Sequence, residues 1–315
     1  MRILLTGSSG WLGKTLMPRL IRAGHDVIGI DPVPSPTTRI VGSVVDRPLV
    51  RATIREFEIE GIIHAGALHK PHVATHDRAA FVAVNIQGTL NLLEESVAKG
   101  STVTRLLMTS TTSLMISKEI RAGRAGGAKR AAWIDESLSP LLPRNIYGVT
   151  KLSAEHFCRL FHELHGLPVV ILRTSRFFPE DDDAANQIAQ SEPNTKANEL
   201  LFRRATVEDI ADSHLVALNK APELGFDTFI ISARTPFTPD DCEQLIVDAP
   251  GVVRRYFPQY PRVYDRLGWT MFDSIDRVYD SSKAQARLGF VCKTNFAERL
   301  HELEQQPLYE PHQPR

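Results

Sequence analysis

The sequence predicts an α/β fold in which helices cover both faces of a doubly wound parallel sheet, with a smaller C-terminal portion. Short apolar runs alternate with segments of helical periodicity up to about residue 174. A glycine-rich turn separates the first run from the first helix, and Asp31 ends the second run. Strands that alternate with helices pair in parallel through right-handed crossovers, so we expect one continuous sheet.

The elements of this sheet follow from hydrophobic periodicity. In chain order they are strand 2–6, helix 11–23, strand 26–31, strand 61–67, helix 78–98, strand 105–110, helix 147–165 and strand 168–174. Gly24 ends the first helix, whose apolar spacing is given by Leu12, Leu16 and Leu20. The two later helices each have an apolar face that we expect to point inward: Ile86, Leu90, Leu93 and Val97 in one, Phe157, Leu160, Phe161 and Leu164 in the other.

A change of character near residue 175 predicts the domain organisation. Residues 1–174 are expected to form the nucleotide-binding domain, and residues 175–315, polar at first and then punctuated by prolines, are expected mainly to bind the substrate. The run 227–233 is a candidate for one more strand of the main sheet. The arginine- and glycine-rich stretch 121–130 is expected to be a flexible surface insertion.

The composition argues against several classes of protein. Lys plus Arg equals Asp plus Glu at 37 each, so no net field attracts nucleic acid or a membrane surface. No apolar run is long enough to span a membrane, and the N-terminus leaves no room for a signal peptide, so we expect a cytoplasmic protein. The cysteines form no CxxC pair, and no carboxylate or cysteine completes a ligand set around the histidines at 64–76, so no metal site is predicted.

The turn after the first strand has the pattern of a dinucleotide site. Gly7, Gly10 and Gly13 stand where small residues let a phosphate approach the backbone and the free N–H groups of a helix. Asp31 ends the next strand, where a carboxylate accepts hydrogen bonds from an adenosine ribose and repels a 2′-phosphate, so NAD is preferred over NADP. Arg39 is the residue that would favour NADP instead. The alternative reading is that the glycines only turn the chain and Asp31 only caps it.

The stretch RNIYGVTK places Tyr147 and Lys151 on one face of a helix, four residues apart. A cation beside a phenol favours the phenolate, so we expect Lys151 to lower the pKa of Tyr147 from its usual value near 10. Such a tyrosine can exchange a proton with a carbinol while hydride moves to or from nicotinamide. The hydroxyl side chains at 110–113 end the preceding strand and are candidates for binding the substrate oxygen, although they also suit a turn.

Together these residues resemble the extended short-chain dehydrogenase/reductase family, in its NAD-dependent epimerase/dehydratase branch. The matching segments, in order, are TGSSGWLG (6–13), IIHAGA (62–67), NIQGT (85–89), STT (110–112), YGVTK (147–151), LRTSRFF (172–178), VEDIADSHLVAL (207–218) and DSSKAQARLGF (280–290). The resemblance covers nearly the whole chain and implies a Rossmann-like fold.

The resemblance also implies roles for single residues. Tyr147 would be the general acid/base, Lys151 would tune it and anchor a ribose, and Thr111 would orient the substrate. The implied cofactor-binding residues are Gly7, Ser9, Gly10, Trp11, Leu12, Gly13, Asp31, Ala65, Gly66, Ala67, Asn85, Thr109, Tyr147 and Lys151. The implied substrate-binding residues are Thr111, Thr112, Arg176 and Arg204. Asn85 has an alternative reading as a helix cap, and Arg204 one as surface charge.

Several departures from the family pattern bear on the reaction. The 4,6-dehydratases place an Asp-Glu pair after the catalytic threonine, whereas Thr112 and Ser113 follow it here, so dehydration is disfavoured. Arg176 replaces the usual asparagine after the strand, and His69 replaces a lysine found in several epimerases. The segment 179–202 is short and acidic, which weakens the expectation of a nucleotide sugar without excluding it.

Three functions remain open. The first is an NAD-dependent epimerase acting on a sugar carbinol, with a nucleotide sugar as the expected substrate. The second is a dehydrogenase or reductase of a sugar, polyol or other secondary alcohol, and the third is a non-catalytic dinucleotide sensor. Retention of Tyr147 and Lys151 counts against the sensor. Family members commonly pair through two long helices, so a homodimer through 78–98 and 147–165 is expected.

Overall fold

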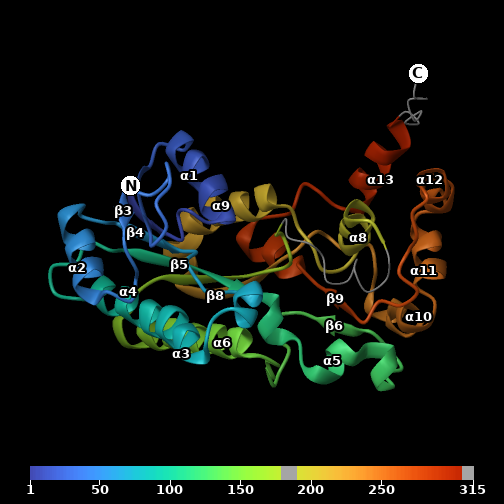
Figure 1. Ribbon diagram of the computed structural model, residues 1–315, viewed down its shortest axis with the longest axis horizontal. Helices are drawn as coiled ribbons and strands as arrows, with labels where there is room; N and C mark the ends of the chain where they lie inside the picture. The colour runs from blue at the N-terminus through green and yellow to red at the C-terminus, as the bar shows by residue number, and fades with distance from the viewer. Residues whose placement is uncertain (179–189, 307–315) are drawn as a thin grey trace.

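A computed structural model describes residues 1–178 and 190–306, and a seven-stranded parallel sheet lies at its centre (Figure 1). The strand order is β3 (Ile40–Val41), β2 (Asp26–Asp31), β1 (Arg2–Thr6), β4 (Gly61–His64), β5 (Arg105–Thr111), β7 (Val169–Thr174) and β8 (Phe226–Ile231). The winding direction changes between β1 and β4, which is where such sheets bind ligands at their carboxyl edge. The predicted α/β fold with a doubly wound sheet is confirmed.

Helices cover both faces of the sheet, as Figure 1 shows. On one face lie α1 (Trp11–Arg22) and α9 (Val207–Leu224), and on the other lie α2 (Arg47–Glu56), α4 (Gly88–Ser96) and α6 (Ile146–His165). Successive strand residues alternate between the two cores, because Ile3 and Leu5 pack with α1 and α9 whereas Leu4 packs with α2 and α4. The expected helix at 78–98 consists of α3 (Arg78–Phe81), a π-helical turn (Val82–Gln87) and α4.

Two features of the helices differ from the sequence-based expectation. Helix α2 and the short β3 were not expected; α2 is capped by Asp46, whose side chain accepts a hydrogen bond from the Leu49 N–H, and it buries only a narrow apolar stripe. On α6, Leu160 is 43% exposed and Leu164 is 66% exposed, so neither points inward. The side of α6 that faces the sheet is instead the one that contains Tyr147.

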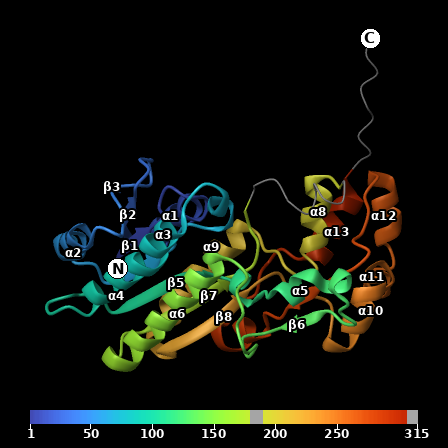
Figure 2. The same cartoon turned by 60° about the horizontal axis from the view of Figure 1, so that its bottom comes forward.

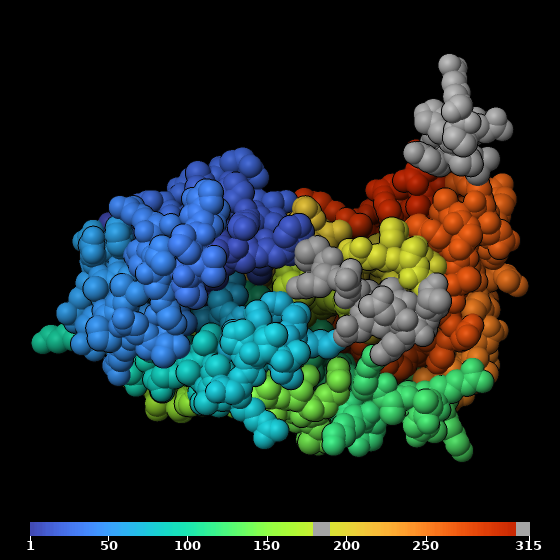
Figure 3. All heavy atoms as spheres, in the orientation of Figure 1, coloured from blue at the N-terminus to red at the C-terminus, as the bar shows by residue number. Residues whose placement is uncertain are grey.

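A smaller portion, built mainly from residues after 175 but joined by α5 and β6, has its own core and a second, two-stranded sheet (Figure 2). Its elements are α5 (Lys118–Ala122), β6 (Ala132–Ile134), α8 (Glu192–Glu199), α10 (Cys242–Val247), α11 (Ala249–Tyr256), α12 (Tyr260–Leu267), β9 (Arg277–Tyr279) and α13 (Phe296–Gln305). The space-filling view shows the surface hollowed between the N-terminal half, in blue, and the C-terminal helices, in yellow to red (Figure 3).

The later half of the chain also returns to the main sheet. The candidate strand at 227–233 forms β8, and α9 covers one face, so the sheet layer is not made by residues 1–174 alone. Lys283, in the DSSKA segment, ties this region together because its ammonium donates to Asp227 Oδ1 (2.6 Å). The expected flexible insertion at 121–130 forms the end of α5 and a 3-10 turn, with Arg124 hydrogen-bonded to the Val247 carbonyl (3.4 Å).

Among the helices of residues 1–178 and 190–306, none combines the length and apolar character that crossing a bilayer requires.

Candidate active site

The turn between β1 and α1 forms a cradle that requires glycine. Gly7 has a φ of +72°, and a Cβ there would lie 2.7 Å from the backbone of Gly66. A Cβ at Gly13 would lie 2.2 Å from the Gly7 carbonyl oxygen. Gly10 caps α1 without a side-chain hydrogen bond to the first turn. The N–H groups of that turn therefore remain available to an anion.

Asp31 lies beside this cradle at the end of β2. Its carboxylate accepts hydrogen bonds from the backbone N–H groups of Ser9 (3.3 Å) and Val33 (2.8 Å). Arg39, the residue that would favour NADP, is stacked on Phe57, with its guanidinium carbon 4.5 Å from the ring centroid. Both observations fit the recognition of an unphosphorylated ribose.

A hydroxyl-rich loop after β2 covers the glycine turn, and the sequence analysis missed it. Thr37 Oγ1 donates to the Ser8 carbonyl (2.6 Å), and Thr38 Oγ1 lies 2.7 Å from Ser8 Oγ and 2.6 Å from Ser9 Oγ. The signal in the sequence was the run SPTT, which follows Asp31 closely. Of the other predicted residues of the turn, Trp11 is exposed and Leu12 is buried in the core.

The three predicted catalytic residues come from the end of β5 and the start of α6, and Tyr147 is hydrogen-bonded to Thr111. Thr111 is the last residue of β5, and Tyr147 and Lys151 lie in the first two turns of α6. Tyr147 is 8% exposed and Lys151 is 1% exposed. Asn145 caps α6 by accepting a hydrogen bond from the Gly148 N–H (2.9 Å). This cap fixes the start of the helix one residue before Tyr147.

The electrostatics of this group correct one expectation. Burial raises the pKa of Tyr147 to about 12, and a hydrogen bond with Thr111 opposes this rise. Burial lowers the pKa of Lys151 to about 8, whereas the charge of Glu155 raises it. The expected lowering of the Tyr147 pKa by Lys151 is therefore wrong for the chain by itself, because both groups are removed from water and the loss of hydration dominates.

A buried ion pair lies beneath Lys151, one helical turn further along α6. Arg173 of β7 donates to both carboxylate oxygens of Glu155, with Nη2 2.7 Å from Oε2 and Nε 3.1 Å from Oε1. Ser110 Oγ donates to the same carboxylate (2.5 Å). The sequence analysis did not single out Glu155 or Arg173, which stand far apart in the chain.

Asn85 connects the loop after β4 to α6. Its side-chain oxygen accepts from the Leu68 N–H (2.9 Å), and its nitrogen donates to the Leu68 carbonyl (2.9 Å) and to Thr150 Oγ1 (3.0 Å). Asn85 lies within the π-helical turn rather than at a helix start. It therefore fixes the loop that also contains the predicted cofactor residues Ala65, Gly66 and Ala67.

Two threonines that were predicted to contact the cofactor or the substrate are hydrogen-bonded within the protein instead. Thr109 Oγ1 lies 2.7 Å from Nε2 of the buried His214, on the face of the sheet that α9 covers. Thr112 is buried and donates to the Thr174 carbonyl (3.3 Å). A cofactor contact through the Thr109 side chain and a substrate contact through Thr112 thus have no geometric support.

The predicted substrate arginines surround a buried carboxylate. Arg204 Nε lies 2.7 Å from Glu199 Oε2, Arg203 Nη2 lies 2.5 Å from Oε1, and Arg176 Nε lies 3.9 Å from Oε2. The Arg204 side chain is only 6% exposed, so its ion pair with Glu199 stabilises the fold and little of its surface is accessible to a substrate. Arg176 is more exposed and remains the better candidate for a ligand contact.

Two of the histidines at 64–76 lie at the end of β4 and in the loop that follows it. His64 lies 2.8 Å from Thr6 Oγ1 and 3.0 Å from Thr89 Oγ1, and burial lowers its pKa to about 3. His69 stacks on Phe178, with ring centroids 4.7 Å apart. Within the described ranges, no three His, Cys, Asp or Glu side chains are grouped so that they could hold a metal ion.

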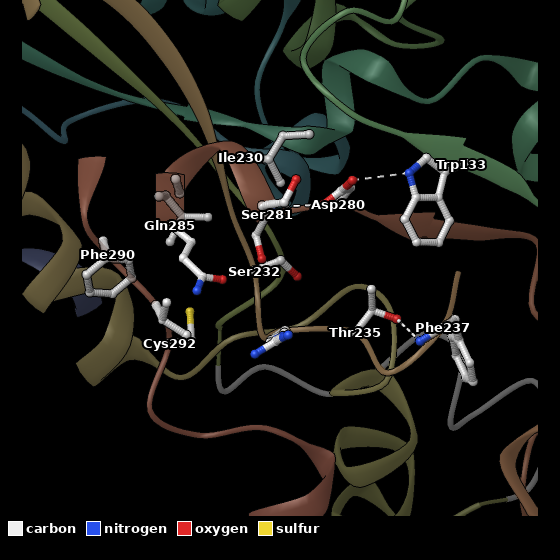
Figure 4. A pocket seen from close by; sticks show the side chains of 15 residues that line it. Trp133, Ile230, Ser232, Thr235, Phe237, Asp280, Ser281, Gln285, Phe290 and Cys292 are labelled. Carbon is white, nitrogen blue, oxygen red and sulfur yellow. Dashed lines mark hydrogen bonds between the residues drawn. The ribbon is translucent and has the colours of Figure 1, made fainter. Parts of the chain in front are cut away.

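A cavity of about 190 Å³ opens at the carboxyl end of β8 (Figure 4). Its wall includes Ser232 and Gln285, together with Trp133, whose Nε1 donates to Asp280 (3.3 Å). None of the predicted catalytic residues lines this cavity. It is therefore separate from the cluster around Tyr147.

The chain has also been compared with known proteins. Residues 3–225 match the model of the NAD dependent epimerase/dehydratase family. The chain belongs to this family. The family requires NAD, which confirms the predicted cofactor.

Curated relatives of this family member differ in their named reactions. It is 32% identical over 207 residues to the GDP-6-deoxy-D-mannose reductase of Pseudomonas aeruginosa, covering 63% of this chain and 62% of that protein. It is 26% identical over 201 residues to a probable dTDP-glucose 4,6-dehydratase of Sinorhizobium fredii, covering 57% and 56%. The chain thus spans less than two thirds of the length of these relatives.

A solved structure with a similar fold extends over the whole epimerase/dehydratase-family chain. The UDP-N-acetylglucosamine 4-epimerase of Bacillus cereus gives a TM-score of 0.64 at 20% identity and covers 97% of this chain and 100% of that one. At this identity the likeness supports the fold, including the C-terminal portion that lies beyond the family match.

Proposed function

We propose that this protein is an NAD-dependent epimerase of a nucleotide sugar, with Tyr147 as the general acid and base. The observation that carries the proposal is the hydrogen bond between Tyr147 and Thr111 at the carboxyl end of β5, with Lys151 one helical turn further along α6. The glycine cradle and Asp31 fit a dinucleotide, since any Cβ at Gly7 would collide with neighbouring backbone. Bound NAD⁺ supplies the hydride acceptor and a positive ring charge.

The chain's own residues would handle the substrate oxygen and its proton. The Thr111 hydroxyl holds the carbinol oxygen, and Tyr147 Oη accepts the carbinol proton as hydride leaves the carbon. The Lys151 ammonium stabilises the phenolate that makes this possible. The keto sugar would then rotate in the site, so that its other face meets the cofactor. Tyr147 Oη would return the proton to the sugar oxygen as hydride adds to that face of the carbonyl carbon.

Two other reactions are weighed against epimerisation. Water loss needs an acid and a base beside Thr111, and the next two residues, Thr112 and Ser113, provide only hydroxyls. A dehydrogenase or reductase would use the same three side chains, and the reductase name of the Pseudomonas aeruginosa relative supports it as the second candidate. A dinucleotide sensor would not need the buried Tyr147 and Lys151.

The replacement Tyr147→Phe tests the role of the phenol. We expect the turnover rate to fall by about 10²- to 10⁴-fold, because the proton transfer loses its acid/base. NAD binding should remain, since the glycine cradle is untouched. Tyr256→Phe, which alters an exposed tyrosine on α11, is the matched control and should keep full activity. Full activity in Tyr147→Phe would exclude Tyr147 as the acid/base.

The nucleotide content of the purified protein separates the two leading reactions. After extensive dialysis, an epimerase that regenerates its cofactor should release close to one NAD per chain on denaturation. It should then interconvert UDP-hexoses without net NADH formation. A protein that loses NAD on dialysis and accumulates NADH with an alcohol substrate would be a dehydrogenase instead.

The proposal extends to the assembly. Leu160 and Leu164 of α6 and Val82 of the neighbouring π-helical turn are exposed apolar side chains. Burial of such a patch favours pairing with a second copy through these helices. A homodimer and a cytoplasmic location stay predictions.

A further inference from the structure

The cavity at the carboxyl end of β8 lies apart from the catalytic cluster and has room for a small molecule. Three parts of the fold enclose it: the end of β8 with the loop that follows, residues 280–292, and β6, which contributes Trp133. None of the three predicted catalytic residues lines it. Binding sites for small molecules are often located where separate units of a fold meet. The composition of the wall then determines which ligand would bind.

Most of the buried wall is apolar. Figure 4 shows Phe290 and Cys292 on one side of the cavity and Trp133 and Phe237 on the other. A cavity of roughly 150 Å³ lined by apolar side chains is large enough for benzene. At about 190 Å³, this cavity has room for a six-membered ring with a short substituent. The apolar lining residues that are almost fully buried are Ile230, Ile231, Phe237, Ala284, Phe290 and Cys292.

Two charged residues line the cavity, and they differ in their partners. Asp280 accepts hydrogen bonds from Trp133 Nε1 (3.3 Å) and from the backbone N–H of Ser282 (2.8 Å). Arg234 is exposed in the loop after β8, and within residues 1–178 and 190–306 no group forms a hydrogen bond or an ion pair with its guanidinium. The charge without a protein partner is therefore positive, and its complement is an anion.

We propose that this cavity is a second ligand site, which binds a small carboxylate with an apolar ring. The ring packs between the aromatic side chains of the wall, and the carboxylate pairs with Arg234, whose guanidinium N–H donors match its two oxygens. A singly charged carboxylate suits the wall better than a phosphate, because Asp280 repels a second negative charge more strongly. The site does not depend on the proposed epimerase reaction.

Isothermal titration of the NAD-saturated protein tests this site, because the cofactor site is then filled. The probes are phenylacetate, which combines a ring with a carboxylate, and phenylacetamide, its neutral analogue of the same shape. We expect the wild type to bind phenylacetate with a dissociation constant of about 1 mM or lower, as suits a ligand of this size. Phenylacetamide should bind at least about 10-fold more weakly, since it lacks the charge-assisted contact.

The variant Arg234→Gln separates the charge from the shape of the cavity. It should bind phenylacetate at least about 10-fold more weakly than the wild type does, and no more tightly than phenylacetamide. Because Arg234 is exposed and forms no ion pair within the described residues, its replacement should leave the fold intact. Arg287→Gln is the matched control: Arg287 is an exposed arginine of the same region that does not line the cavity, and it pairs with Asp227 (2.7 Å). Its phenylacetate affinity should stay within about twofold of the wild type.

Three results would overturn the site: no binding of phenylacetate by the wild type up to about 10 mM, equal affinity for the two probes, or full phenylacetate affinity in Arg234→Gln. An equal loss of affinity in Arg287→Gln would also count against it, because a general change in surface charge would then explain the effect. Loss of activity in Tyr147→Phe bears on the proposed function alone, so the two proposals stand or fall separately.

Discussion

The ammonium group of Lys151 is buried, and the residues beneath it explain how it can remain charged. Glu155 is one helical turn away on the same face of α6, and its charge raises the pKa of Lys151 against the effect of burial. Arg173 and Ser110 fix that carboxylate through hydrogen bonds of 2.7 and 2.5 Å. Glu155 is therefore a positioning residue that acts through Lys151.

The variant Glu155→Gln should shift the pH profile of the enzyme. Lys151, whose pKa is about 8, would lose the charge that raises this pKa, so it would deprotonate at lower pH. Activity that needs the charged lysine is present below that pKa and lost as the pH rises through it. We therefore expect the alkaline decline of kcat/KM to move to lower pH.

The control for this variant is Glu95→Gln. Glu95 is a buried carboxylate paired with Arg47 (2.7 Å) and Arg51 (2.9 Å), away from the site. Glu155→Gln should lower the free energy of unfolding by up to about 3–5 kcal/mol, since it leaves the buried Arg173 without its carboxylate partner. Glu95→Gln should cost less, because Arg47 and Arg51 are half exposed. Only Glu155→Gln should move the pH profile, and an unchanged profile in the active variant would rule out the coupling to Lys151.

The residues that could be predicted at the site are those whose spacing along the chain reflects their chemistry. The glycine turn, Asp31 and the pair of Tyr147 and Lys151 are of this kind. The pair of Glu155 and Arg173 was missed, because it joins a helix and a strand that only the folded sheet brings together. The shift predicted for the Tyr147 pKa had the wrong direction, because the spacing of two residues along a helix does not show how deeply they are buried.

At the scale of elements, the close approach of α1 to the turn after β1 determines which side chains the glycine turn tolerates. Gly13→Ala would place a Cβ 2.2 Å from the Gly7 carbonyl oxygen, so the start of α1 must shift. We expect NAD affinity to fall by at least about 10-fold and stability to fall by about 1–3 kcal/mol. NAD titration and thermal unfolding measure the two effects.

Gly61→Ala is the matched control on β4. A Cβ there meets nothing nearer than 3.6 Å, an ordinary contact with the Arg105 side chain. NAD affinity should stay within about twofold of the wild type. A normal NAD affinity in Gly13→Ala would show that the cradle does not position the cofactor.

The elements themselves were largely predictable, because parallel strands buried on both faces give strong apolar runs. The parallel pairing of the strands followed from their alternation with helices. Helix α2 was missed because its apolar stripe is narrow. The inward face of α6 was misassigned at Leu160 and Leu164, because periodicity shows that a helix has an apolar face but not whether this face meets the sheet or a second copy.

At the scale of the whole molecule, the exposed side of α6 predicts the assembly. The double substitution Leu160→Glu, Leu164→Glu puts charges on side chains that are 43% and 66% exposed, so the fold should persist. We expect the wild type to have the mass of two chains by light scattering and the variant that of one. Val247→Glu, at a 57% exposed position on α10, should stay dimeric. A wild type with the mass of one chain would exclude the dimer.

The small sheet of β6 and β9 has a consequence for how the enzyme matures. β6 lies between Thr111 and Tyr147 in the chain, yet its partner is β9, with Ala132 opposite Arg277. Contacts between segments so far apart in sequence form slowly, and during synthesis β9 emerges long after the catalytic residues. A nascent chain can therefore bind NAD through its completed N-terminal strands before the surroundings of Tyr147 are in place. The chain would therefore become active only at a late step of folding, after it has bound NAD.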